Sequence, residues 1–167
     1  TVEQLLSLES AAFTLEHLTG TTTLLPGLEM TKASGVVEVP DAFAVTVEAE
    51  LASLRSFIEI GVVTIDDTAY MTDILTGGWR MVPPSSLPFT VANLGDTLAG
   101  VIEAVHAPEL VAKDRLRGME TYLVRGDIKS QDLARLVPGA GTGFDVVLEL
   151  WLDRSNGLLL QALITGK

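Results

Sequence analysis

Alternation of apolar and polar residues is the feature of this sequence that most constrains its fold. Residues 43–51 and 144–152 place an apolar side chain at every second position. Because successive side chains of a β-strand point to opposite faces, such runs predict strands of a sheet with one apolar and one wet face. Less regular runs predict further strands at residues 12–18, 31–39, 56–64, 68–72, 110–117, 120–128 and 158–165.

Most of these strands follow one another through short turns, which predicts a mostly antiparallel sheet. Asn156-Gly157, for example, is typical of a hairpin turn that needs a positive φ. Residues 2–12, 92–105 and 130–137 have the apolar spacing of helices. The fold class is therefore α+β. The length of 167 residues and the lack of internal repeats predict a single domain, residues 1–167.

The charge balance excludes some partners. The chain has 11 basic and 22 acidic residues, a net charge of −11, which repels the phosphates of nucleic acids and of anionic membranes. It has no Cys, which excludes disulfides and thiolate metal sites. No segment has the roughly 18 uninterrupted apolar residues of a membrane-spanning helix.

Few residues offer catalytic or metal chemistry. His17 and His106 are the two histidines, and their spacing fits no metal-binding motif. Asp66-Asp67 fits a turn better than a carboxylate pair, and the glycine-rich residues 139–143 precede a strand rather than the helix that a phosphate loop needs. We expect no catalytic residue, no metal and no cofactor.

Apolar residues are in excess for so few helices. They make up 47% of the chain, and the predicted strands offer more apolar surface than the predicted helices can cover. Both a filled core and an apolar ligand cavity are compatible with this composition. The proline-rich segment 81–89 is suited to a flap or rim over an opening.

Four segments in order carry a resemblance to a known family. They are VVTIDDTAYMTDILTGGWRMVP at 62–83, SAAFTLEH at 10–17, GMETYLVRGDI with SQDLARLVPG within 118–139, and ELWLDRSNGLLLQALI at 149–164. Together they resemble the LppX/LprG/LprA/LprF family of actinobacterial cell-envelope lipoproteins. The resemblance implies a single strongly curved sheet, a half-barrel like that of LolA/LolB, wrapped over a few helices and enclosing a hydrophobic cavity.

The resemblance also implies a function and a location. The cavity would hold acyl chains of lipids or acylated glycolipids during transport in the bacterial envelope, with no catalysis. The precursor would be anchored to the membrane by a lipidated Cys upstream of Thr1, which this sequence does not contain. We expect an extracytoplasmic monomer. Two alternatives stay open: a protein-binding envelope module, or a small enzyme that pairs His17 with a carboxylate.

The candidate cavity residues are those that the alternation places on the apolar face, together with the apolar stripe of the central helix. They are Phe43, Val45, Val47, Ile58, Ile60, Val62, Met71, Leu98, Val101, Ile102, Val146, Leu148 and Leu150. The candidate rim residues are Trp79, Met81, Leu87 and Phe89.

Overall fold

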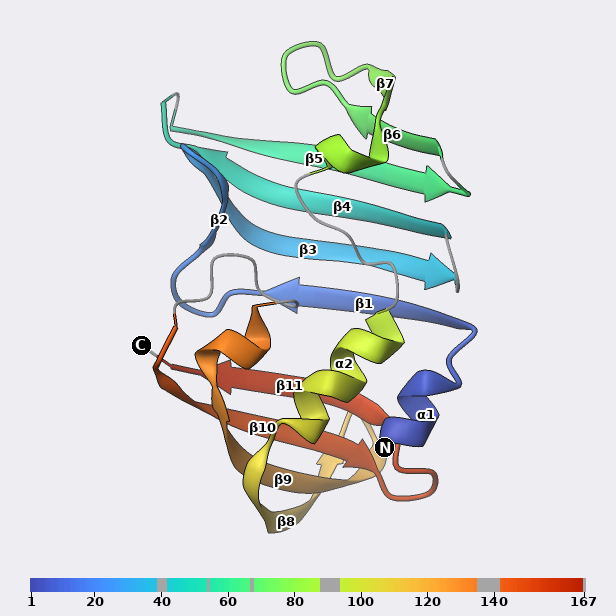
Figure 1. Ribbon diagram of the computed structural model, residues 1–167, viewed down its shortest axis with the longest axis vertical. Helices are drawn as coiled ribbons and strands as arrows, with labels where there is room; N and C mark the ends of the chain where they lie inside the picture. Colours follow the sequence, from blue (N-terminus) through green and yellow to red (C-terminus); the bar gives the residue numbers. More distant parts are fainter. Residues whose placement is uncertain (39–41, 54, 67, 88–93, 135–141, 167) are drawn as a thin grey trace. The chain divides into compact units, whose positions relative to one another are not determined.

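The computed structural model divides into two compact units (Figure 1). Unit 1 comprises residues 1–8 and 95–167, and unit 2 comprises residues 9–94. The structure describes residues 1–38, 42–53, 55–66, 68–87, 94–134 and 142–166. Compact units of this kind can belong to one domain, so the single domain over residues 1–167 stays a prediction.

Unit 2 is an antiparallel sheet of seven strands. The strands are β1 (Ser10–Glu16), β2 (Thr22–Leu25), β3 (Leu28–Glu38), β4 (Ala42–Leu51), β5 (Ser56–Ile65), β6 (Thr68–Thr72) and β7 (Trp79–Val82). Their order is β1-β3-β4-β5-β6-β7, so β3 to β7 form a meander. β2 pairs with the start of β3 and β1 with the rest of it, so both strands share one edge of β3. A short 3₁₀ helix, η1 (Pro84–Ser86), follows β7.

In its described residues, unit 1 combines a four-stranded antiparallel sheet with two α-helices. The helices are α1 (Val2–Leu6) and α2 (Leu94–Glu103), and the strands are β8 (His106–Leu116), β9 (Met119–Lys129), β10 (Asp145–Asp153) and β11 (Leu159–Thr165), in the order β11-β10-β9-β8. A 3₁₀ helix, η2 (Ser130–Leu133), follows β9. Gly157, at φ 74°, makes the predicted positive-φ turn between β10 and β11.

The strands form two hydrogen-bonded sheets in the described residues, where the sequence predicts one. Alternation shows that a segment is a strand, but it carries no information on its pairing partner, so two sheets and one sheet give the same pattern.

Two element predictions are also wrong. Residues 22–25, which lie between two predicted strands and were not predicted as one, form β2. The helix expected over 2–12 ends at Leu6 because Ser10–Ala12 pair with β3.

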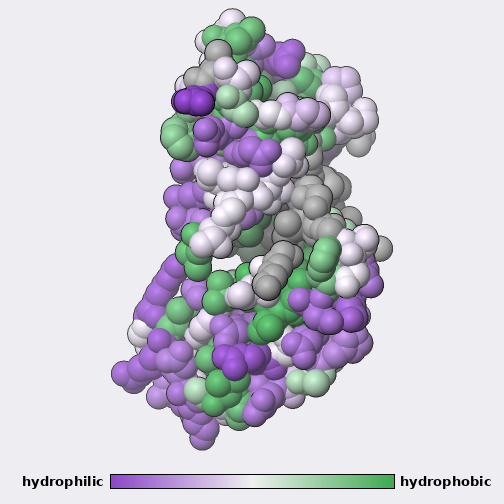
Figure 2. All heavy atoms as spheres, turned by 90° about the vertical axis from the view of Figure 1, so that its left-hand side faces the viewer, coloured by the Kyte–Doolittle hydropathy of each residue, from purple (hydrophilic) through white to green (hydrophobic). Residues whose placement is uncertain are grey.

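The surface carries many large apolar side chains. Figure 2 shows one side of the molecule, on which apolar residues reach the surface between polar and charged ones. Phe57 is 74% exposed and Met81 is 68% exposed. Among the described residues, no helix has the length and apolar character needed to span a membrane.

Candidate functional site

The predicted cavity residues of unit 2 lie together on one face of its sheet. Val45 pairs with Val62, Val62 pairs with Met71, and Val47 pairs with Ile60. The pairing register places Phe43 and Ile58 on the same face, which we call the core face. The alternation therefore predicted correctly which side chains share a face.

The core face is almost entirely apolar. Its buried cluster consists of Leu28, Met30, Ala33, Val37, Phe43, Val45, Val47, Ala49, Ile60 and Val62. Ile58 and Met71 are half-buried and pack against this cluster. Since these side chains neither titrate nor act as nucleophiles, they can contact alkyl groups but cannot transfer protons.

The remaining cavity candidates lie in unit 1. Val101 from α2 packs with Val146, Leu148 and Leu150 from β10 in a second buried cluster, and Ile102 packs against it. Leu98 lies on the same helix and is half-buried. The apolar stripe of α2 thus covers β10, as its spacing predicts.

The predicted rim residues do not share one location. Trp79 pairs with Thr72 and Met81 with Tyr70, which places both side chains on the face opposite the core face. We call this the outer face. Leu87 packs instead against the buried cluster of the core face. Phe89 lies outside the described residues.

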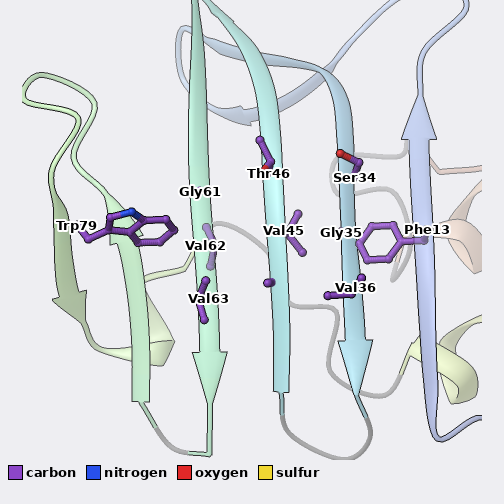
Figure 3. A pocket seen from close by; sticks show the side chains of 11 residues that line it. Phe13, Ser34, Gly35, Val36, Val45, Thr46, Gly61, Val62, Val63 and Trp79 are labelled. Atoms are coloured by element: carbon purple, nitrogen blue, oxygen red, sulfur yellow. The ribbon is translucent and has the colours of Figure 1, made fainter.

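A depression of about 510 Å³ lies on the outer face (Figure 3). The Trp79 indole forms one side of it and stands over Gly61, where an added Cβ would lie 2.6 Å from Cη2 of the ring. Phe13 borders it at the other end, beside Gly35, with which it pairs. The Trp79 ring thus covers Gly61, an arrangement that compensates for a missing side chain in a strand.

Sequence reasoning missed this depression because it assigned the outer face to water. The signal was present in Val36, Ala44 and Val63, which are apolar at positions where the alternation expects polar residues.

A second depression of about 400 Å³ lies in unit 1. Beside it, the Arg154 guanidinium stands 5.4 Å from the centre of the Tyr122 ring and donates a hydrogen bond to the carboxylate of Glu120.

His17 has a structural environment. Its Nδ1 lies 3.2 Å from the carbonyl oxygen of Thr31, and its Nε2 lies 2.8 Å from Oγ1 of Thr22. Both ring nitrogens therefore link the end of β1 to β2 and β3, and within the described part of the chain neither is hydrogen-bonded to a carboxylate. His106 is the exposed first residue of β8 rather than the end of the preceding helix. No group of three or more potential metal ligands exists in the described ranges.

Among the described aspartates, three have lowered pKa values. The backbone N–H groups of Thr76 and Leu75 hold the pKa of Asp73 below its ordinary value. The indole N–H of Trp151 does the same for the pKa of Asp114, and the hydroxyl of Ser155 for the pKa of Asp153. Asp114 is exposed and the other two are half-buried, and all three order loops or link strands, because each is stabilised in its ionised form by donors.

The profile of the LppX_LprAFG lipoprotein family matches residues 2–166 of the chain. The chain belongs to this family. Membership of the LppX_LprAFG lipoproteins implies a location in the cell envelope. None of the curated proteins matches the chain.

Two solved structures have the same fold. The structure of LprF from Mycobacterium bovis matches with a TM-score of 0.75 and 17% identity, covering 99% of this chain and 83% of that one. The structure of LppX from Mycobacterium tuberculosis matches with a TM-score of 0.59 and 17% identity, covering 99% of this chain and 88% of that one. The chain is thus a mostly antiparallel β-sheet protein with an LppX/LprF-like fold.

Proposed function

We propose that this lipoprotein binds lipids or acylated glycolipids, holds their acyl chains against apolar side chains, and carries them in the cell envelope without catalysis. The observation that carries the proposal is the core face of unit 2. Seven residues from three adjacent strands, chosen from the sequence as lipid contacts, share that face. The family to which the chain belongs supports the proposal, because its members are generally non-catalytic, lipid-binding lipoproteins.

Burial of alkyl groups supplies the affinity in this proposal. Each buried CH₂ contributes about 0.8 kcal/mol, so an acyl chain that buries about ten of them gains about 8 kcal/mol. That gain corresponds to a micromolar dissociation constant before the cost of ordering the chain is subtracted. Two acyl chains then suffice for tight binding without any charged contact.

The proposal assigns roles to the candidate residues. The core-face residues of unit 2 contact acyl chains, with Leu87 as a rim residue of that face, and the residues of α2 and β10 form an apolar surface of unit 1 that also contacts acyl chains. A lipid anchor upstream of Thr1 holds the monomeric protein on the extracytoplasmic side of the membrane. We assign Trp79 and Met81 to a different surface, described below.

Native mass spectrometry tests this function. We expect protein purified from a lipid-containing host to carry a bound mass in the phospholipid or glycolipid range, which organic extraction releases. We also expect apo protein to take up an added diacyl phospholipid. An apo mass with no uptake of that lipid would contradict the proposal.

Two neighbouring residues provide a matched pair of variants. Met71 is half-buried on the core face, whereas Tyr70 lies on the outer face and is 36% exposed. We expect Met71→Trp to lower lipid uptake because its larger ring occupies space on the core face, and Tyr70→Trp to leave uptake unchanged. Equal uptake by both folded variants would remove the core face from the site.

A further inference from the structure

A continuous band of apolar side chains crosses the outer face of unit 2. Val36 pairs with Ala44, Ala44 with Val63, Val63 with Tyr70, and Tyr70 with Met81. Trp79 lies beside this row on β7. We call these six residues the outer band. Met81 is 68% exposed, Trp79 55% and Val36 54%, so the band faces solvent, whereas the core-face residues behind it are buried or, like Met71, half-buried.

The outer band is hollowed rather than flat. The depression of about 510 Å³ has Ala44 and Val63 in its lining, and the Trp79 indole rises at one side of it over Gly61 (Figure 3). Gly61 leaves room for the ring to lie against the strand backbone, and its N–H donates to the Thr72 hydroxyl at 2.8 Å. A preformed apolar hollow of this kind accepts the anchoring side chains of a partner.

Carboxylates lie next to the outer band on the same face. Glu48 is directly opposite Glu59, and Glu50 is directly opposite Glu29. Like charges opposite each other on a sheet are destabilising unless positive charge lies nearby. Lys32 Nζ lies 3.6 Å from Oε1 of Glu48. It sets one positive charge against the negative charges of these four carboxylates.

The surplus of negative charge extends through the whole of unit 2. Residues 9–94 contain eleven acidic residues and three basic ones, Lys32, Arg55 and Arg80. Arg80 is paired with an acidic residue, because its Nε lies 3.8 Å from Oδ2 of Asp73. A second copy of this chain docked on this face would place its own acidic residues against the acidic residues of the first copy, and the two copies would repel each other. An anionic bilayer would be repelled for the same reason. The charge therefore favours a partner with Lys or Arg beside its apolar contacts.

We propose that the outer band is a docking surface for a partner protein that inserts apolar side chains into the hollow and places Lys or Arg side chains against Glu48 and Glu59. This inference goes beyond lipid binding, because it uses the opposite face of the same sheet. A partner can dock there while the core face holds lipid, so the two ligands do not compete for side chains.

Two synthetic peptides provide the test. One carries central Leu and Trp side chains flanked by lysines, and the other has glutamates in place of the lysines. Each is titrated into ¹⁵N-labelled protein, and amide shifts are followed by NMR. We expect the lysine peptide to shift the amides of the outer band and of Glu48 and Glu59, and the glutamate peptide to shift none of them.

Variants separate the apolar from the charged contribution. We expect Met81→Ser to weaken binding of the lysine peptide about tenfold, as loss of an anchoring contact does. The control is Met119→Ser, at an exposed methionine of unit 1, and we expect it to have no effect. Replacing Glu48 and Glu59 together by Gln should weaken binding about threefold and reduce its salt dependence.

Four results would each overturn the proposal: equal shifts with both peptides, no binding of the lysine peptide, shifts that map to other residues, or an unchanged affinity in Met81→Ser. Self-association of the unliganded chain through the outer band would assign this face to a second copy. Shifts of the same amides with phosphatidylcholine vesicles would assign it to a lipid surface. Met71→Trp should leave peptide binding unchanged, which separates this test from that of lipid binding.

Discussion

Two glycines of the unit 2 sheet meet different neighbours, which gives a matched pair of variants. At Gly61, an added Cβ would lie 2.6 Å from Cη2 and 2.9 Å from Cζ2 of Trp79, the far end of a half-exposed side chain. At Gly35, it would lie 2.9 Å from Cα of Val45 and even closer to the carbonyl oxygen of Ala44, both of which are backbone atoms. We therefore expect Gly35→Ala to be destabilising and Gly61→Ala to be tolerated.

The magnitudes follow from what has to move. In Gly35→Ala, β3 and β4 must separate, which costs about 1–3 kcal/mol for overpacking and about 1 kcal/mol for each ladder hydrogen bond that weakens. The sum is about 3 kcal/mol. In Gly61→Ala, the indole turns aside, and the loss of its contact is offset by the ~0.5–1 kcal/mol by which Ala is preferred to Gly within a strand. The net change is within about 1 kcal/mol.

Thermal unfolding followed by circular dichroism measures both changes. For a chain of this size, about 3 kcal/mol corresponds to a drop in Tm of about 6–12 °C for Gly35→Ala. Gly61→Ala should keep its Tm within a few degrees, while the fluorescence of Trp79 changes because the ring leaves the strand. Equal losses of Tm, or a larger loss for Gly61→Ala, would refute the reasoning from close contacts.

Three further predictions concern polar groups. His17→Phe should lower the free energy of unfolding in urea by about 1–3 kcal/mol, because it leaves the buried Thr22 hydroxyl without its histidine partner, and lipid uptake should not change. Trp151→Phe should raise the pKa of Asp114 towards its ordinary value, measured by NMR titration of the carboxyl carbon, and an unchanged pKa would show that the indole N–H is not its main cause. Asp73→Ala should lower Tm at pH 7, and the difference from the parent protein should shrink below about pH 4, because a carboxyl with a lowered pKa stabilises the fold only while ionised.

Regular alternation predicted the central strands well. β4 and β10 begin and end within one residue of the predicted bounds, because both are flanked by strands on each side and have one buried face. β2 was not predicted because it has four residues between Gly20 and Pro26, too few for a period. Phe144 was placed on the apolar face, yet it is 53% exposed because β10 begins at the next residue.

Of the two faces of the unit 2 sheet, only the core face was predicted from the sequence as a candidate site. The core-face residues were identified because apolar residues at alternate positions within a strand predict a shared face. The outer band was missed as a surface because Val36, Ala44, Val63 and Tyr70 are single apolar residues on separate strands, while Trp79 and Met81 of β7 were expected at the rim of a cavity. Val36, Val63 and Tyr70 form a row only once the pairing register is known, and no pattern within one strand contains that register.

The discontinuity of unit 1 has a consequence for the order of folding. Leu5 of α1 is 2% exposed, and α1 belongs to the same unit as the strands that end the chain. Unit 2 lies between these two parts in the sequence, and its meander of β3 to β7 needs only short-range loop closures. We therefore expect the amides of β3 to β7 to gain protection from hydrogen exchange early in refolding. The first residues of the chain are then among the last to reach their native contacts.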